Sequence, residues 1–304
     1  MRKKISIGLI GALVFLLGWY LFLKPGDYIV TFKANTFPGA INQTLKSWGK
    51  ERFSGKIIQQ KNLLHINQKL QFGDSLVDYE WIITPISDST SQVKVRITDE
   101  KNSLKNRVLV PFTNSIIEKR SKETLLDYSA FLNRHIQKFK VKVDGEAELP
   151  QSFCAYLPAK GIQSEKAFGM MRDFPYLSSF IQENNLKPNG TPFVEITNWN
   201  TVTDSIAFNF CYPVQKTDSL PSHHEIKFKE YPRRKSIKAT YFGNYMTSDR
   251  AWYRILTYAE KNGITVDSNP IEIFRDNPSL GGNELEWKAE IYMPIHCHRG
   301  RDYL

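Results

Sequence analysis

The hydrophobic pattern is densest at the start of the chain. Three basic residues at positions 2–4 precede residues 5–23, which contain no charged side chain. As a helix, this run would be about 28 Å long at ~1.5 Å per residue, close to the ~30 Å hydrocarbon core of a bilayer. Bulky residues from Trp19 to Leu23 occupy the place where a cleaved signal peptide needs small ones. The pattern predicts a transmembrane anchor over residues 1–25. The basic N-terminal flank favours a body on the extracytoplasmic side of a bacterial inner membrane.

Residues 26–147 alternate between strand and helix patterns. The expected elements are a strand from Asp27 to Asn35, a short helix over 38–48, four strands, and a long helix over 112–139. The four strands are expected at 55–60, 63–72, 75–85 and 91–98.

This order of elements, with the opening stretch DYIVTFKANTFPGAINQTLKSW, resembles the START-like helix-grip (SRPBCC) family. The resemblance implies a curved antiparallel sheet that grips a long C-terminal helix, often around an apolar cavity. A filled scaffold domain is the alternative. Tyr79 and Trp81 alternate with polar neighbours and are interpreted as core residues, and His65 as a histidine satisfied within the sheet.

An internal repeat covers most of residues 148–304. The first copy spans about 153–214 and the second about 237–295, and each copy reads as strand, helix, strand, strand. Matching positions pair Asn184 with Asn262, Pro192 with Pro270, and Pro213 with Pro294.

The helix of the second copy has clear end signals. We expect it to begin after Ser248 as the N-cap and to end at Asn262-Gly263, where glycine can adopt a left-handed conformation. In the first copy Pro175 interrupts the matching region, so we expect that helix to restart there.

The second copy resembles the gyrase-inhibitor-like effector-binding domain, which is also fused to AraC-type and MerR-type regulators. The resemblance rests on YFGNY at 241–245, Ala251-Trp252, Pro270 and the closing strand EIYMPI at 290–295. The predicted class is therefore α+β: an N-terminal transmembrane helix, a helix-grip sheet with a long C-terminal helix, and a duplicated β-α-β-β effector-binding domain.

Glu290 is the principal candidate for a binding residue. Strand alternation places Lys288, Glu290 and Tyr292 on one face, and a lone buried carboxylate there is costly. The resemblance implies that this glutamate faces a groove between the two copies and attracts lipophilic cations. Tyr241, Tyr245 and Tyr292 could supply aromatic rings, and Trp252 is a further candidate, although its helical spacing favours core packing.

Two other interpretations of Glu290 stay open. It could form a salt bridge with Lys288 or with an arginine such as Arg254. It could also serve as the general base of an anchored hydrolase, as an equivalent glutamate does in some relatives of the domain. Asn209 matches Glu290 in the first copy, so the groove is expected to hold one acid.

The leading hypothesis is a membrane-anchored small-molecule binder that is not an enzyme, with no cofactor or metal. An envelope scaffold that binds another protein is a further alternative. His296-Cys297-His298 has metal-ligand spacing but lacks other ligands nearby, and His223-His224 lies in a polar linker. Cys154 and Cys211 would either pair with each other or remain buried thiols.

Composition excludes some classes of protein. The 304 residues include only three cysteines, too few for a disulfide scaffold. The net charge of +10 permits contact with nucleic acid or acidic lipid, but the basic residues, including the run at 233–235, form no dense stripe. We find no helix-turn-helix pattern, so no nucleic acid is expected as a partner.

Overall fold

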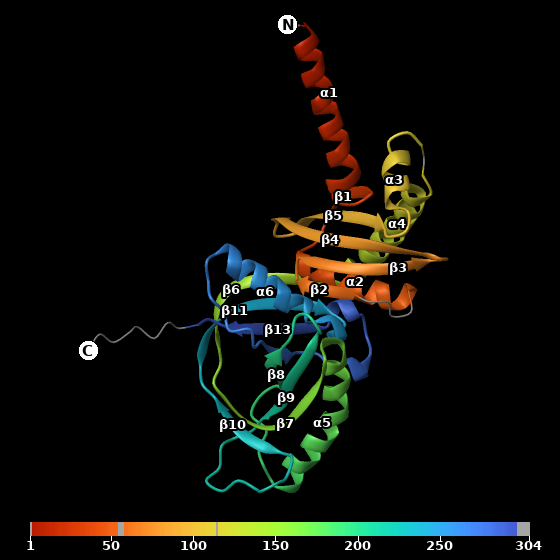
Figure 1. The fold of residues 1–304 in the computed structure, drawn as a ribbon. Coiled ribbons are helices and arrows are strands. Elements are labelled where there is room, and N and C mark those ends of the chain that lie inside the picture. The colour runs from red at the N-terminus through yellow and green to blue at the C-terminus, as the bar shows by residue number, and fades with distance from the viewer. Residues whose placement is uncertain (1, 54–57, 114, 297–304) are drawn as a thin grey trace, which may run out of the picture. The chain divides into compact units, whose positions relative to one another are not determined.

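The computed structural model describes residues 2–53, 58–113 and 115–296 (Figure 1). The chain divides into two compact units, Met1–Arg134 and His135–Leu304. The division falls earlier than the expected boundary at 147/148, because strand β6 (Phe139–Leu149) pairs with β11 (Arg234–Gly243) in the sheet of the second unit.

The chain begins with helix α1 (Arg2–Gly18), followed by a π-helical turn at Trp19–Leu23. Among the described residues, no helix combines the length and the apolar composition that a membrane crossing requires. The expected transmembrane helix is therefore not found.

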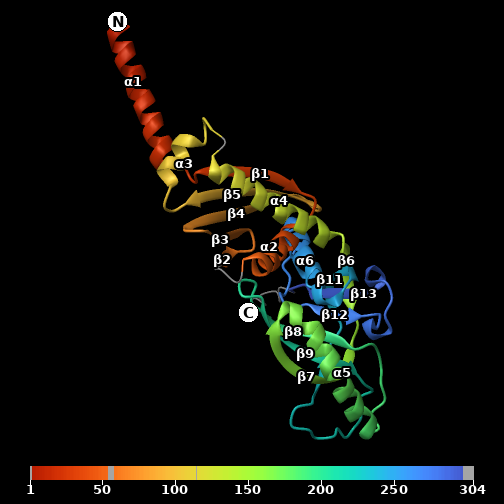
Figure 2. The same ribbon diagram turned by 90° about the vertical axis from the view of Figure 1, so that its right-hand side faces the viewer.

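The first unit contains a five-stranded antiparallel sheet in the order β1-β5-β4-β3-β2. Its strands are β1 (Tyr28–Ala34), β2 (Ile58–Asn62), β3 (His65–Phe72), β4 (Ser75–Ser87) and β5 (Thr90–Asp99). Its further helices are α2 (Pro38–Arg52), α3 (Ser103–Leu109), which the sequence analysis did not anticipate, and α4 (Ile116–Ile136). Figure 2 shows the long helix α4 running across this sheet. The element order agrees with the expected one, while the START-like resemblance itself stays a prediction.

Aromatic rings fill the space between this sheet and its helices. Trp81 of β4 lies 4.9 Å from Tyr128 of α4 and 6.4 Å from Trp48 of α2, measured between ring centroids. All three side chains, and Tyr79, are fully buried, so the interpretation of Tyr79 and Trp81 as core is confirmed. The His65 Nε2 lies 2.7 Å from the Glu80 Oε1, which agrees with a histidine satisfied within the sheet.

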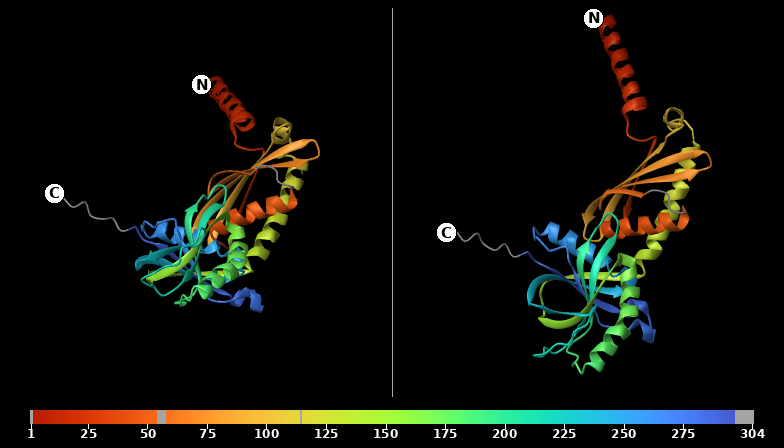
Figure 3. Two further views of the ribbon diagram at one scale, coloured as in Figure 1. Left: turned by 90° about the horizontal axis from the view of Figure 1, so that it is seen from below. Right: turned by 60° about the horizontal axis from the view of Figure 1, so that its bottom comes forward.

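The second unit is built on an eight-stranded sheet in the order β10-β7-β9-β8-β12-β13-β11-β6. The first copy supplies β7 (Ser152–Ile162), α5 (Lys166–Glu183), β8 (Phe193–Trp199) and β9 (Ser205–Pro213). The second supplies β11, α6 (Arg250–Lys261), β12 (Ile271–Phe274) and β13 (Lys288–Pro294). Strand β10 (Lys227–Tyr231) lies between the two copies along the chain and at the edge of the sheet, beside β7. The copies meet at the sheet centre, where β8 pairs with β12. The strand-helix-strand-strand repeat is thus present twice, and Figure 3 shows the curvature of the sheet.

The two repeat helices differ in part from expectation. α5 runs continuously through Pro175 instead of restarting there. Pro175 is exposed, so water can satisfy the carbonyl that a mid-helix proline leaves without its amide partner. α6 ends as expected, with Gly263 at φ +65°. Ser248, however, is not the N-cap; its hydroxyl donates to the Glu272 carboxylate instead.

The two faces of this sheet have different surroundings. On one side, the helix face, the Trp252 indole of α6 donates to Glu272 of β12, and Gly169 of α5 lies against the Phe208 ring. Ile273 alternates with Glu272 and pairs with Glu290, so both point to the opposite side. We call that side, which α5 and α6 do not cover, the open face.

Candidate functional site

A cluster of buried apolar side chains occupies the open face where the two copies meet. It consists of Leu149, Cys154, Phe193, Cys211, Tyr231, Ile271, Ile273 and Tyr292. These residues come from both copies and from the ends of strands β6 and β10. The duplicated fold therefore places one continuous apolar surface across the centre of the sheet.

Leu149 and Tyr231 divide this surface into two pockets. Both residues, together with Ile271, line a pocket of about 280 Å³ and a second pocket of about 220 Å³. They lie at the ends of β6 and β10, just before the short connections that lead to β7 and β11. The Tyr231 ring packs edge-on against Phe193 at 5.1 Å, so it forms part of a wall between the pockets.

The larger pocket, which we call the apolar pocket, has a hydrophobic floor and a polar rim. It is lined by Leu149, Pro150, Gln151, Ser152, Asn189, Gly190, Thr191, Phe193, Pro213, Tyr231, Ile271, Ile273 and Arg275. Among these described lining residues, none is acidic and Arg275 is the cation. Its volume is near the low end of the ~300–1,000 Å³ typical of ligand pockets, so it suits a small ligand.

The smaller pocket, which we call the charged pocket, holds both signs of charge. Its lining includes Glu195, Lys229, Arg234 and Asp267. The Glu195 carboxylate accepts hydrogen bonds from Lys229 Nζ at 2.5 Å, and from the Tyr231 hydroxyl and Asn209 Nδ2 at 2.7 Å each. These donors satisfy Glu195 without a ligand.

Glu290 lies on the open face and is only 6% exposed. Its carboxylate pairs with three cations: Arg275 Nη2 at 2.6 Å, Lys288 Nζ at 2.9 Å and Lys238 Nζ at 3.1 Å. Burial alone would raise the pKa of this carboxyl. The hydrogen bonds from the three cations outweigh burial and hold its pKa at about 2.

These contacts change the interpretation of Glu290. The predicted salt bridge with Lys288 is present, and two further cations join it, so the carboxylate already has its partners. A general base works best with a pKa near the operating pH, and a carboxyl group with a pKa of about 2 is a weak base. A role for Glu290 in ligand binding stays a prediction. The cost of an unpaired buried carboxylate no longer supports it, because three cations pair with this side chain.

The aromatic candidates divide between the two faces. Tyr292 shares the face of Glu290, and Lys238 Nζ lies 5.4 Å from the centre of its ring. Tyr241 pairs with Ala289 and is fully buried on the helix face, where its hydroxyl contacts Thr247 at 2.7 Å. The Tyr245 hydroxyl donates to the Lys288 carbonyl. Tyr241 and Trp252 therefore do not surround Glu290.

The open face carries a second acid, Glu195, besides Glu290. Asn209, the counterpart of Glu290, pairs with Glu195 in register on the neighbouring strand, and both point to the open face. Comparing equivalent positions of the two copies could not reveal Glu195, because it has no acidic counterpart. Its alternation with Phe193 along β8 is the sequence signal that identifies it.

A buried polar network on the helix face was also missed. Glu272 is fully buried and accepts from the Trp252 indole at 2.5 Å and from the Ser248 hydroxyl at 3.0 Å. Lys166 Nζ, also fully buried, lies 3.7 Å from Glu272 and donates to the Tyr245 carbonyl. Burial raises the pKa of Glu272, although Lys166 acts against this. Glu272 stands in the otherwise apolar run IEIF, which was its only signal.

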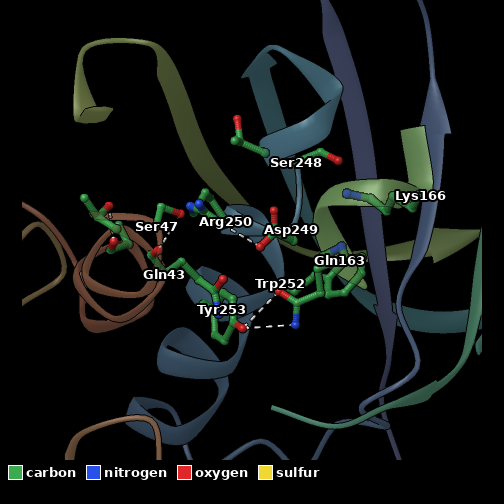
Figure 4. A network of polar contacts seen from close by, with 12 residues as sticks. Gln43, Ser47, Gln163, Lys166, Ser248, Asp249, Arg250, Trp252 and Tyr253 are labelled. Carbon is green, nitrogen blue, oxygen red and sulfur yellow. Dashed lines mark hydrogen bonds and ion pairs between the residues drawn. The ribbon is translucent and has the colours of Figure 1, made fainter. Parts of the chain in front are cut away.

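The same network continues along the start of α6 (Figure 4). Arg250 Nη1 donates to Asp249 Oδ2 at 2.5 Å, and its Nε to His135 Nε2 at 3.2 Å. The Tyr253 hydroxyl and the Gln163 side-chain amide lie 3.1 Å apart. Because these groups are buried and partnered, the network is a structural support between the helices and the sheet.

The remaining candidates show no organised chemistry. Cys154 and Cys211 are both free and buried, in agreement with the thiol alternative. Burial raises the pKa of Cys154 to about 12. Cys297 and His298 lie outside the described residues, and the described residues contain no group of three metal-ligating side chains.

Comparisons with known proteins agree with this architecture. Residues 148–296 match the family described as the GyrI-like small molecule binding domain. This confirms the expected domain in the C-terminal half of the chain. None of the curated proteins matches the sequence.

Several solved structures are similar to part of the chain at low identity. An EcmrR–DNA complex is 15% identical, covering 64% of this chain and 72% of its own, with a TM-score of 0.44. SAV2435 bound to tetraphenylphosphonium is 13% identical (51% and 94% covered, TM-score 0.36). A hydrolase from Listeria innocua is 10% identical (52% and 92% covered, TM-score 0.34).

Proposed function

We propose that this protein binds a small lipophilic molecule in the apolar pocket on the open face and is not an enzyme. The main support for this proposal is the pocket of about 280 Å³ at the junction of the two copies, where Phe193, Ile271 and Ile273 form an apolar floor. Burial of an apolar ligand surface there would contribute about 25 cal/mol per Å². The match of residues 148–296 to a small-molecule-binding family supports the same role.

The test is a ligand screen with a pocket-filling variant. Ile273→Trp places a bulky ring in the apolar pocket and should abolish the thermal shift that a hit produces in the wild type. Val202→Trp adds the same ring at the exposed loop between β8 and β9, which lines neither pocket, and should keep the shift. Circular dichroism checks that both variants fold. Equal binding by Ile273→Trp would refute the assignment of the pocket.

A preference for lipophilic cations, which the family resemblance implies, is the alternative form of this proposal. A lipophilic cation would need an available carboxylate, and both Glu195 and Glu290 already have cationic partners. A calorimetric titration with tetraphenylphosphonium tests this form directly. We also expect no nucleic-acid partner. A hydrolase that uses Glu290 and an envelope scaffold are the alternative functions, and both stay predictions.

Attachment to a bacterial inner membrane, with the body on the extracytoplasmic side, is also proposed. Its support is the uncharged run at 5–23, whose apolar side chains are largely exposed, such as Leu13 at 67% and Phe15 at 73%. Fractionation should find the full chain in the membrane pellet and a chain lacking residues 1–25 in the supernatant. A C-terminal reporter active only in the cytoplasm would refute the orientation.

A further inference from the structure

The charges around the apolar pocket bear on the class of its ligand. Arg275 lines the pocket, its side chain is 41% exposed, and the described lining residues include no acid. A ligand that fills this pocket meets a hydrophobic floor and one guanidinium group at the rim.

Arg275 retains hydrogen-bonding capacity. Its Nε and Nη2 donate to Glu290 Oε2, and its Nη1 donates to the Thr191 hydroxyl at 3.3 Å. A guanidinium carries five N–H donors, so two are left after these three contacts. The geometry suits a carboxylate or a similar anion, which guanidinium binds better than other side chains do.

Glu290 does not cancel this positive charge. Lys238 and Lys288 pair with the same carboxylate as Arg275. The three cations therefore share the single carboxylate of Glu290, while Asp276 accepts from the Lys288 backbone amide at 2.7 Å. Asp144, which contacts Thr240 at 2.6 Å, has its own lysine, Lys142.

Building on the proposed function, we propose that the apolar pocket selects small amphipathic anions. The apolar body packs on Phe193, Ile271 and Ile273, and the anionic head binds Arg275. A cationic head at the same place would face the Arg275 guanidinium, with no acid among the described lining residues. The proposed ligand class is therefore opposite in charge to the lipophilic cation that the family resemblance implies.

The experiment uses three probes with one ring system and different head groups: 2-naphthylacetate, 2-naphthylacetamide and 2-naphthylethylammonium. Isothermal titration calorimetry with the full chain should show naphthylacetate binding about tenfold or more tightly than the amide, and the ammonium probe most weakly. Raising the salt concentration should reduce the advantage of the anion.

Two variants separate a role in the pocket from a role in the ion-pair cluster. Arg275→Gln and Lys288→Gln each remove one partner of Glu290, but only Arg275 lines the pocket. Arg275→Gln should lose the preference for naphthylacetate over the amide, and Lys288→Gln should keep it. Thermal melts check that both variants fold.

The outcomes distinguish this inference from the proposed function. Equal binding of the three probes, tightest binding of the ammonium probe, or a preference that survives in Arg275→Gln would overturn the anion assignment and leave a small-molecule pocket. If no probe binds and the ligand screen also fails, the proposed function itself is wrong.

Discussion

Replacing Glu290 with glutamine tests whether its three ion pairs stabilise the fold. The side chain keeps its size and loses its charge, so Arg275, Lys238 and Lys288 lose their common partner. The expected consequence is a loss of stability at neutral pH, since three cations then stand close together without a carboxylate.

The magnitude follows from the pKa of Glu290. Its lowering from 4.5 to about 2 corresponds to about 3 kcal/mol at 1.36 kcal/mol per pKa unit. Arg275 and Lys288 are 41% and 38% exposed, so solvent screening reduces the expected contribution to about 1–2 kcal/mol.

The stabilisation by the Glu290 ion pairs should depend on pH. Because the pKa is lower in the folded state than in the unfolded state, the stabilisation is present above about pH 4.5 and is lost as the pH falls toward 2. Wild type and Glu290→Gln should therefore differ by about 1–2 kcal/mol at pH 7 and should converge below pH 3.

Urea titration with hydrogen exchange and mass spectrometry measures this effect at the β13 peptide, which reports the unit that contains Glu290. Glu183→Gln removes a carboxylate from the exposed end of α5 and serves as the control, with little change expected at either pH. A difference between wild type and Glu290→Gln that is the same at pH 7 and pH 2.5 would show that the ion pairs contribute nothing.

Three further predictions address other parts of the second unit. Tyr231→Ala should join the 280 and 220 Å³ pockets, so calorimetry should show tighter binding of two-ring ligands and no gain for one-ring ligands. In a Cys297→Ser background, iodoacetamide at pH 8 should label neither Cys154 nor Cys211 in the native protein and both in urea, because burial raises both thiol pKa values; native labelling would contradict their burial. Lys166→Met should lower the free energy of unfolding by about 3–5 kcal/mol, because it leaves the buried Glu272 carboxyl without its cationic partner, and adding Glu272→Leu should recover much of the loss.

The architecture of the second unit could be predicted because its signals are local and occur twice. Strand alternation placed Glu290 and Tyr292 on one face, and the register of β13 agrees. The Asn262-Gly263 signal ended α6 where expected. The predicted restart of the helix at Pro175 was wrong, because solvent can satisfy the backbone groups around an exposed proline and α5 continues through it.

The surroundings of Glu290 could not be predicted from spacing along one strand. Arg275 follows β12 and Lys238 lies on β11, and only the pairing of both strands with β13 brings them to Glu290. Tyr241 was misplaced for the related reason that its face depends on the register of β11 with β13, which pairs it with Ala289. The face on which a residue lies within one segment can be predicted from periodicity. Ion pairs between strands can be predicted only when the register of the strands is known.

The duplicated fold produces a groove with different chemistry in its two halves. Equivalent strands carry Asn209 and Glu290, while Glu195 stands opposite Ile271 on the neighbouring strand. As a result, the charged pocket holds both acids and bases, whereas the apolar pocket has Arg275 at its rim and no acid among its described lining residues. A symmetric apolar molecule would gain only from burial, which is non-directional. A molecule with an apolar body and an anionic head would gain from burial and from charge in one orientation only, so the asymmetry of the groove would orient such a ligand.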